Sequence, residues 1–228
     1  IHRNSEVWIN GHYLGKWPYG YTSFRYELTQ WLKHRGQKNV VAVRVDNAQQ
    51  PNSRWYTGSG IYRDVRLITT SKTAINHWGV FVTTPKVSQQ QATVVAAYDV
   101  RKEGEGQLQF KSSVYDAAGN LINENISSNF EQGKYYQTFQ ITQPKLWSAE
   151  NPHQYRLVTK VLEGQKLVEQ YTTNFGVRYF NFDADEGFSL NGKALKILGV
   201  CQHHDLGALG AGFNISAAKR QLKILKKM

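Results

Sequence analysis

Three adjacent residues, His203, His204 and Asp205, carry side chains that could bind a polar ligand. They follow an apolar run at residues 196–200 and lie in a polar, glycine-rich loop at residues 201–214. A neutral imidazole and a carboxylate can both form hydrogen bonds with hydroxyl groups of a ligand. The pattern therefore predicts a ligand-binding loop, and the alternative is a solvated loop whose histidines contact only their neighbours.

The same His-His-Asp run could instead hold a metal ion. Adjacent residues on one loop rarely provide a complete coordination shell, and the sequence has no second Cys or His pair at ligand spacing. Cys201 is the single cysteine, so an intramolecular disulfide is excluded. We therefore expect no metal ion and no other cofactor in this chain.

The elements that must position the loop are expected to form one β/α unit. Residues 196–200 are a nearly continuous apolar run, which is typical of a strand buried on both faces in a parallel sheet. Residues 216–228 are expected to be helical, with an apolar stripe on one side and lysines on the other. A hairpin with an Asn191-Gly192 turn is expected just before the strand.

The first third of the chain is predicted to be antiparallel β-structure. Asn10-Gly11 between apolar stretches indicates a type I′ hairpin, because both central residues of that turn need positive φ. A helical turn capped by Thr29 is expected later in this part. Besides the hairpin, strands are expected at residues 24–28, 40–45 and 62–68.

The middle of the chain contains short strand-like segments separated by turn residues. Their spacing is close to that of a β-sandwich of immunoglobulin type. No cysteine pair supports this prediction, which depends on the pattern alone. The six strands are expected near residues 78–83, 93–100, 108–115, 136–141, 155–162 and 167–175.

Composition excludes several classes of function. Of the 228 residues, 40% are hydrophobic and 20% are charged, a globular balance, and no apolar run approaches the roughly 18 residues of a membrane span. The formal net charge of +11 could favour nucleic acid, but no basic stripe with interleaved aromatic residues occurs. We therefore expect neither a nucleic-acid partner nor a membrane. The chain begins at Ile1 without a basic-plus-apolar leader, so we expect an internal piece of a longer protein.

Five motifs, in order along the chain, resemble glycoside hydrolase family 2, the family of bacterial β-galactosidases and β-glucuronidases. The segment at residues 53–65, with the sequence SRWYTGSGIYRDV, is the most specific of them. The others are at residues 7–15, 146–152, 175–178 together with 188–193, and 199–205.

The resemblance implies a mainly β fold in three parts. Residues 1–73 would form the C-terminal part of a sugar-binding-like jelly-roll β-sandwich. Residues 74–182 would form an immunoglobulin-like β-sandwich. Residues 183–228 would begin a catalytic TIM barrel with its first β/α unit, and the loops after barrel strands build the active site of such folds.

The resemblance further implies a retaining hydrolase that cleaves terminal β-galactosides of an oligosaccharide, with β-glucuronidase activity as the alternative. Retention requires two carboxylates about 5 Å apart, and the family places these glutamates on later barrel strands. We therefore assign no catalytic residue here and expect the chain alone to be inactive. A homo-oligomer is compatible with the family, and the compartment stays open between bacterial periplasm and cytoplasm.

By the same resemblance, His203 takes the place of a substrate-contacting histidine of β-galactosidases. Asp205 takes the place of an acidic sugar-contacting residue of β-glucuronidases, and His204 is a third substrate-binding candidate. Cys201-Gln202 stands where β-galactosidases often carry Asn-Arg, which leaves the exact sugar open.

A competing hypothesis is a non-catalytic carbohydrate-binding protein built of β-sandwiches. The loop residues Trp17, Tyr19 and Tyr21 could form an aromatic platform for a sugar, whereas Trp8 on a strand is expected in the core. The predicted β/α unit argues against this hypothesis, because a sandwich protein has no use for a lone buried parallel strand. Arg63 and Asp64 are expected to be a structural pair.

Overall fold

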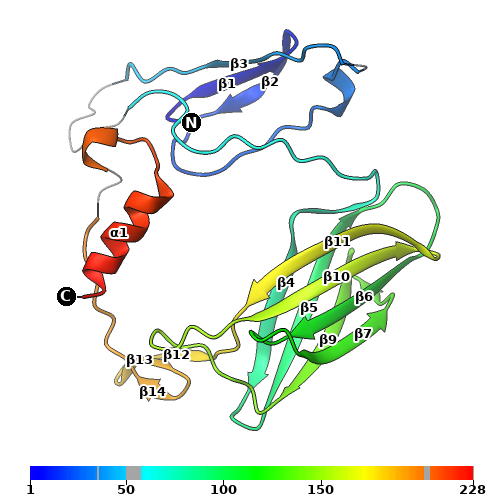
Figure 1. Ribbon diagram of the computed structural model, residues 1–228, viewed down its shortest axis with the longest axis vertical. Helices are drawn as coiled ribbons and strands as arrows, with labels where there is room; N and C mark the ends of the chain where they lie inside the picture. Colours follow the sequence, from blue (N-terminus) through cyan, green and yellow to red (C-terminus); the bar gives the residue numbers. More distant parts are fainter. Residues whose placement is uncertain (35, 50–57, 203–205, 228) are drawn as a thin grey trace. The chain divides into compact units, whose positions relative to one another are not determined.

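The computed structural model describes residues 1–34, 36–49, 58–202 and 206–227. The chain divides into two compact units (Figure 1). Unit 1 comprises Ile1–Leu67 together with Val200–Met228, and unit 2 comprises Ile68–Gly199. The fold is mainly β, with four antiparallel sheets among the described residues.

The sheet of unit 1 is built around the predicted hairpin. Asn10 has φ 49° and Gly11 has φ 88°, so both turn residues adopt the left-handed conformation that a type I′ turn requires. The first strand alternates buried and half-buried residues, and Val7 and Ile9 face the inside. The sheet has the order β2-β1-β3 and consists of β1 (Ser5–Ile9), β2 (His12–Trp17) and β3 (Val41–Arg44).

Three predictions for the first third of the chain were wrong. Residues 24–28 and 62–68 form no strand, because they make no ladder of backbone hydrogen bonds with a described strand. The helical turn exists as η1 (Thr29–Trp31), but Thr29 lies inside it and does not cap it. The Glu27 carboxylate instead accepts a hydrogen bond from the Thr29 N–H at 3.0 Å.

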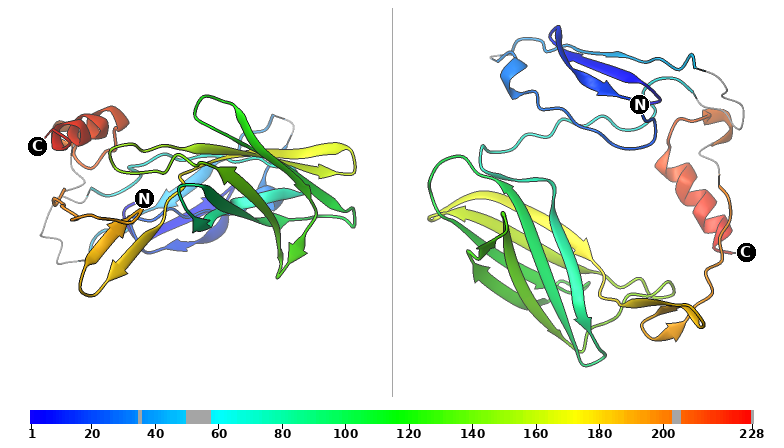
Figure 2. Two further views of the ribbon diagram at one scale, coloured as in Figure 1. Left: turned by 90° about the horizontal axis from the view of Figure 1, so that it is seen from below. Right: turned by 180° about the vertical axis from the view of Figure 1, so that it is seen from behind.

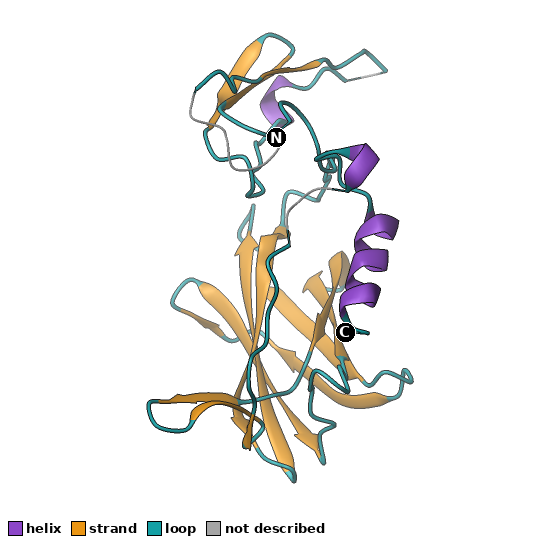
Figure 3. Ribbon diagram, turned by 90° about the vertical axis from the view of Figure 1, so that its left-hand side faces the viewer, coloured by secondary structure: helices purple, strands orange, loops and turns teal. Residues whose placement is uncertain are grey.

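Unit 2 is dominated by a β-sandwich, and all six strands predicted for it are present. Figure 2 shows the sandwich from two further directions, and Figure 3 marks its strands in orange. One sheet has the order β11-β10-β6-β7 and the other β4-β5-β9-β8. The strands are β4 (Ala74–Val87), β5 (Gln91–Arg101), β6 (Leu108–Tyr115), β7 (Leu121–Ser127), β8 (Phe130–Glu131), β9 (Lys134–Thr142), β10 (Tyr155–Glu163) and β11 (Lys166–Phe175).

The core of the sandwich combines apolar packing with one buried polar cluster. Apolar side chains from both sheets are fully buried there, among them Val94, Phe110 and Leu157. The Tyr98 hydroxyl donates to Gln137 Oε1 at 3.0 Å and accepts from Thr159 Oγ1 at 3.2 Å. Because an unpaired buried polar group is costly, these bonds let polar side chains occupy the core.

Strand β7 was not predicted from the sequence. Its residues do not alternate cleanly between apolar and polar types. Two of its half-buried residues are asparagines, whose side-chain amides form hydrogen bonds with the other sheet. Asn123 Nδ2 donates to the Gln140 carbonyl oxygen at 2.8 Å, and Asn125 Nδ2 donates to the Thr138 carbonyl oxygen at 2.9 Å. These bonds occupy backbone carbonyls of β9 and join the two sheets along one edge.

A small three-stranded sheet follows the sandwich. It has the order β12-β13-β14 and consists of β12 (Phe180–Asp183), β13 (Gly187–Leu190) and β14 (Lys193–Ala194). Asn191 has φ 52° and Gly192 has φ 77°, so the predicted second Asn-Gly hairpin is confirmed. Strand β12 is an addition that the sequence pattern did not predict.

The predicted strand at residues 196–200 was wrong, whereas the helix after it is present. No described strand pairs with residues 196–200, and Leu198 is 81% exposed. A parallel strand needs a neighbouring strand for its backbone groups, and an apolar run alone does not supply one. The helix is α1 (Ile215–Leu225), preceded by the short turn η2 (Gly207–Leu209). No described helix combines the length and apolar character that a bilayer span requires.

Candidate functional site

The sequence-predicted ligand-binding residues His203, His204 and Asp205 lie outside the described residues. The structure describes the chain on both sides of them. On the N-terminal side, Gln202 Nε2 donates a hydrogen bond to Gln221 Oε1 at 2.8 Å. This bond joins the start of the loop to helix α1 of the same unit.

The second side of the loop is held by backbone hydrogen bonds. Leu206 N–H donates to the Gly210 carbonyl oxygen at 3.0 Å, which closes a turn around η2. Phe213 N–H then donates to the Tyr62 carbonyl oxygen at 3.2 Å. The loop is therefore joined to the segment that carries the most specific motif of the sequence.

Asn214 fixes the point at which helix α1 begins. Its Oδ1 accepts hydrogen bonds from the N–H groups of Ser216 and Ala217, both at 3.0 Å. Asparagine is among the best N-cap residues, because its side chain satisfies N–H groups that the first turn leaves unpaired. The sequence analysis missed this cap, although an asparagine directly before the helix is its usual signal.

Tyr62 links several parts of unit 1. Its hydroxyl donates to the Gly20 carbonyl oxygen at 2.6 Å, and the Arg63 guanidinium lies 5.3 Å from its ring centroid. Asp64 forms its ion pair with Arg66 at 3.0 Å, and both side chains are about three-quarters exposed. The expected pair between Arg63 and Asp64 is therefore not observed. An exposed ion pair such as Asp64–Arg66 typically contributes about 0–1 kcal/mol to the free energy of unfolding.

The aromatic residues proposed as a sugar platform pack on neighbouring aromatic rings. Trp17 stacks on Phe24 with ring centroids 5.5 Å apart, and Tyr19 meets Tyr21 edge-on at 5.6 Å. Tyr19 remains 56% exposed, and burial is the main cause that raises the pKa of Tyr21. Trp8 is half-buried on the face of β1 opposite the core residues, so its expected core position is not observed.

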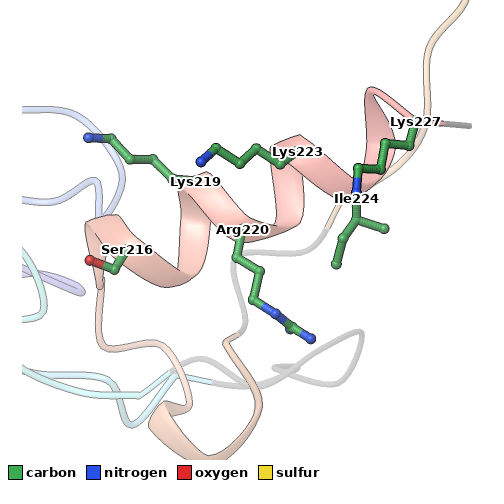
Figure 4. A pocket seen from close by; sticks show the side chains of 6 residues that line it. All are labelled: Ser216, Lys219, Arg220, Lys223, Ile224 and Lys227. Atoms are coloured by element: carbon green, nitrogen blue, oxygen red, sulfur yellow. The ribbon is translucent and has the colours of Figure 1, made fainter.

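Helix α1 carries a basic surface. A hollow of about 570 Å³ runs along it, lined by Ser216, Lys219, Arg220, Lys223, Ile224 and Lys227 (Figure 4). Four of these six side chains are cationic and none is acidic, so the hollow offers no acid–base pair for hydrolysis. Among the described residues there is no group of three or more His, Cys, Asp or Glu side chains placed to hold a metal ion.

The sequence and the fold of this chain are similar to those of glycosyl hydrolases. Residues 73–178 match the family model described as Glycosyl hydrolases family 2. The chain is 47% identical over its whole length to the β-galactosidase BoGH2A of Bacteroides ovatus and 37% identical to a putative β-glucuronidase of Formosa agariphila.

A solved structure shows the same relationship. A β-glycosidase from Bacteroides vulgatus matches 99% of the chain with a TM-score of 0.90 and 35% sequence identity. The chain belongs to glycosyl hydrolases family 2. It spans 27% of the length of BoGH2A, 22% of the Formosa agariphila protein and 29% of the Bacteroides vulgatus chain.

Proposed function

We propose that this chain forms part of a retaining glycoside hydrolase that cleaves terminal β-galactosides. The observation that carries the proposal is the 47% identity, over the whole chain, to a protein named as a β-galactosidase. Since the chain spans 27% of that protein, hydrolysis is proposed for a longer polypeptide that contains it. The substrate would be an oligosaccharide with a galactose at its non-reducing end.

Within this proposal, residues 1–73 are the end of a jelly roll, residues 74–182 an immunoglobulin-like domain, and residues 183–228 the start of the catalytic barrel. His203, His204 and Asp205 would contact sugar hydroxyls. The bonds at Gln202 and Phe213 support this role, because they anchor both sides of the loop. The two catalytic carboxylates would lie about 5 Å apart elsewhere in the polypeptide, so the chain alone is expected to be inactive.

A β-glucuronidase is the second candidate function. Relatives named as putative β-glucuronidase and β-glucuronidase are 37% and 30% identical to this chain. An acidic sugar needs a cationic partner for its carboxylate, and a neutral galactoside does not. The residue that distinguishes the two sugars is therefore expected to be an arginine or lysine near the pocket.

The test is a direct comparison of two substrates. The longer gene product would be assayed with 4-nitrophenyl β-D-galactopyranoside and with the corresponding β-D-glucuronide. The proposal expects a higher kcat/KM for the galactoside. A higher value for the glucuronide would favour the second candidate, and turnover of neither substrate would contradict both.

A further inference from the structure

Asn191 joins the small sheet of β12, β13 and β14 to the β-sandwich. It is the first residue of the turn between β13 and β14, and its backbone N–H donates to the Tyr179 carbonyl oxygen at 2.9 Å. Its Oδ1 accepts from the Tyr179 N–H at 3.2 Å, and its Nδ2 donates to the Trp147 carbonyl oxygen at 2.9 Å. Trp147 lies between β9 and β10 of the sandwich, and the small sheet lies at one end of it (Figure 1). One side chain therefore holds the residue before β12 and a loop of the sandwich together.

Trp147 is itself held on the sandwich by three contacts. Its N–H donates at 2.8 Å to the carbonyl oxygen of Val177, whose side chain is fully buried in the core. The Arg178 guanidinium lies 5.3 Å from its ring centroid. A Cβ at Gly176 would lie 3.0 Å from the Trp147 side chain, so the close approach of the two segments depends on this glycine. The carbonyl group that accepts from Asn191 is therefore a well-anchored part of the sandwich.

The other Asn-Gly turn of the chain makes the same set of bonds within a single sheet. The Asn10 N–H donates to the Val40 carbonyl oxygen at 2.9 Å, and Asn10 Oδ1 accepts from the Val40 N–H at 3.0 Å. Asn10 Nδ2 also donates to a tryptophan carbonyl oxygen, that of Trp31, at 2.8 Å. Trp31 belongs to η1, between β2 and β3 of the sheet that contains Asn10. Asn10 thus stabilises one sheet, whereas Asn191 connects two.

The chain leaves the small sheet directly after the turn that Asn191 holds. The Leu195 N–H donates to the Phe188 carbonyl oxygen at 2.9 Å, next to the pairs between β13 and β14. Residues 196–200 follow, and then the proposed sugar-contacting loop at residues 201–214. No described strand pairs with residues 196–200. The hairpin therefore sets the direction in which the chain starts toward the loop.

We propose that Asn191 is a positioning residue of the hydrolase. Its bond to Trp147 fixes the direction in which the chain leaves the immunoglobulin-like domain toward the loop that contains His203. The inference rests on the proposed function, which gives this loop its contact with the sugar. Asn191 acts through the hairpin and residues 196–200. A displacement of about 1 Å at reacting groups can cost a large factor in rate, so a hydrogen bond far from the sugar can change kcat/KM.

The test compares Asn191→Asp with Asn10→Asp in the longer enzyme. Aspartate keeps the acceptor oxygen and tolerates positive φ, but it lacks the Nδ2 donor, so each variant loses the bond to its tryptophan carbonyl. Asn10→Asp also loses a bond to Asn39 Oδ1, so the control loses more hydrogen bonds than the variant under test. Asn191→Asp should lower kcat/KM for the nitrophenyl galactoside about fivefold, the factor that corresponds to one hydrogen bond, and Asn10→Asp should leave it unchanged.

Hydrogen exchange of the same enzymes separates positioning from stability. Asn191→Asp should speed exchange of the backbone amides at residues 196–214, whereas Asn10→Asp should speed exchange only in its own sheet. Gly176→Ala approaches the same link from the other side, because it keeps Asn191 but forces the Trp147 side chain to give by a few tenths of an ångström. It should also speed exchange at residues 196–214, and it decides the question if Asn191→Asp does not fold.

Two outcomes would overturn the proposal. One is unchanged exchange at residues 196–214 in both Asn191→Asp and Gly176→Ala, since the bond would then stabilise the small sheet alone. The other is an equal loss of kcat/KM in the two aspartate variants, since that would be a general effect of stability. If the longer enzyme cleaves neither substrate, the proposed function fails, and the exchange comparison still decides whether Asn191 orders the chain that enters the loop.

Discussion

Gln202 and Gln221 are joined by a side-chain hydrogen bond, 2.8 Å from Nε2 to Oε1, across 19 positions of the sequence. The bond fixes the residue directly before the proposed sugar-contacting loop to the middle of helix α1. With the Phe213–Tyr62 backbone bond on the other side, it leaves the loop two anchored ends. Anchoring of this kind reduces the conformational entropy that the loop must lose when a sugar binds.

Replacing Gln221 by leucine should therefore weaken substrate binding. The expected result is an increase in KM of about three- to tenfold in the longer enzyme, because one hydrogen bond worth about 1 kcal/mol is lost. Steady-state kinetics with the nitrophenyl galactoside measures it. Gln170→Leu on strand β11 is the control and should leave KM unchanged. A similar KM for both variants and the parent would show that the bond does not position the loop.

The buried Tyr98 hydroxyl should contribute strongly to the stability of unit 2. Tyr98→Phe leaves Gln137 and Thr159 without their shared partner and should lower the free energy of unfolding by about 1–3 kcal/mol. Urea unfolding measures the change. Tyr171→Phe, at a site that is 36% exposed, should change it by less than about 0.5 kcal/mol. Equal effects at both sites would contradict the role of the buried hydroxyl.

The turn conformation at Gly11 predicts a difference between two glycine substitutions. A Cβ would meet nothing within 4 Å at Gly11 or at Gly199, but only Gly11 has positive φ, at 88°. Gly11→Ala should therefore destabilise the chain by about 1–2 kcal/mol, the cost of a left-handed conformation for an L-residue, and Gly199→Ala should be near neutral. Thermal unfolding compares them. A smaller loss at Gly11 than at Gly199 would mean that the turn does not hold the hairpin.

The lowered pKa of Asp116 predicts that part of the folding stability is lost in acid. Hydrogen bonds from Asn120, first from its side chain at 2.9 Å and then from its backbone N–H, hold the pKa of Asp116 below its ordinary value of 3.8. Because the folded pKa is depressed, the contribution is present above pH 3.8 and is lost as the pH falls through the lower folded value. Asp116→Asn should lower the melting temperature near neutral pH, and the difference from the parent should shrink as the pH falls below the ordinary value of 3.8. A difference that does not vary with pH would contradict this.

The sequence predicted those elements whose signal is local. The two Asn-Gly turns were found because the dipeptide itself prefers the required positive φ, at Asn10 as at Asn191. The six sandwich strands were predicted because the alternation of apolar and polar residues indicates which face of each strand is buried. Strand β7 was missed because its inward residues, Asn123 and Asn125, are polar and act through hydrogen bonds to the other sheet.

Elements that depend on a partner could not be predicted from the sequence. An apolar run such as residues 196–200 shows a tendency to be buried, but a strand also requires a neighbour that supplies N–H and C=O groups. The same reason explains the absence of strands at residues 24–28 and 62–68. For the candidate site, the loop and its helix were anticipated, whereas the Gln202–Gln221 and Phe213–Tyr62 bonds join residues far apart in the sequence.

The most direct test of the central claim is the activity of a His203→Ala variant of the longer enzyme on 4-nitrophenyl β-D-galactopyranoside. If the loop after Gln202 contacts the sugar, kcat/KM should fall by at least about 100-fold, which corresponds to about 2.7 kcal/mol of lost transition-state stabilisation. His34→Ala, at an exposed site of the same unit, should retain the activity of the parent. Full activity of the His203→Ala enzyme would contradict the claim that this loop forms part of the sugar pocket.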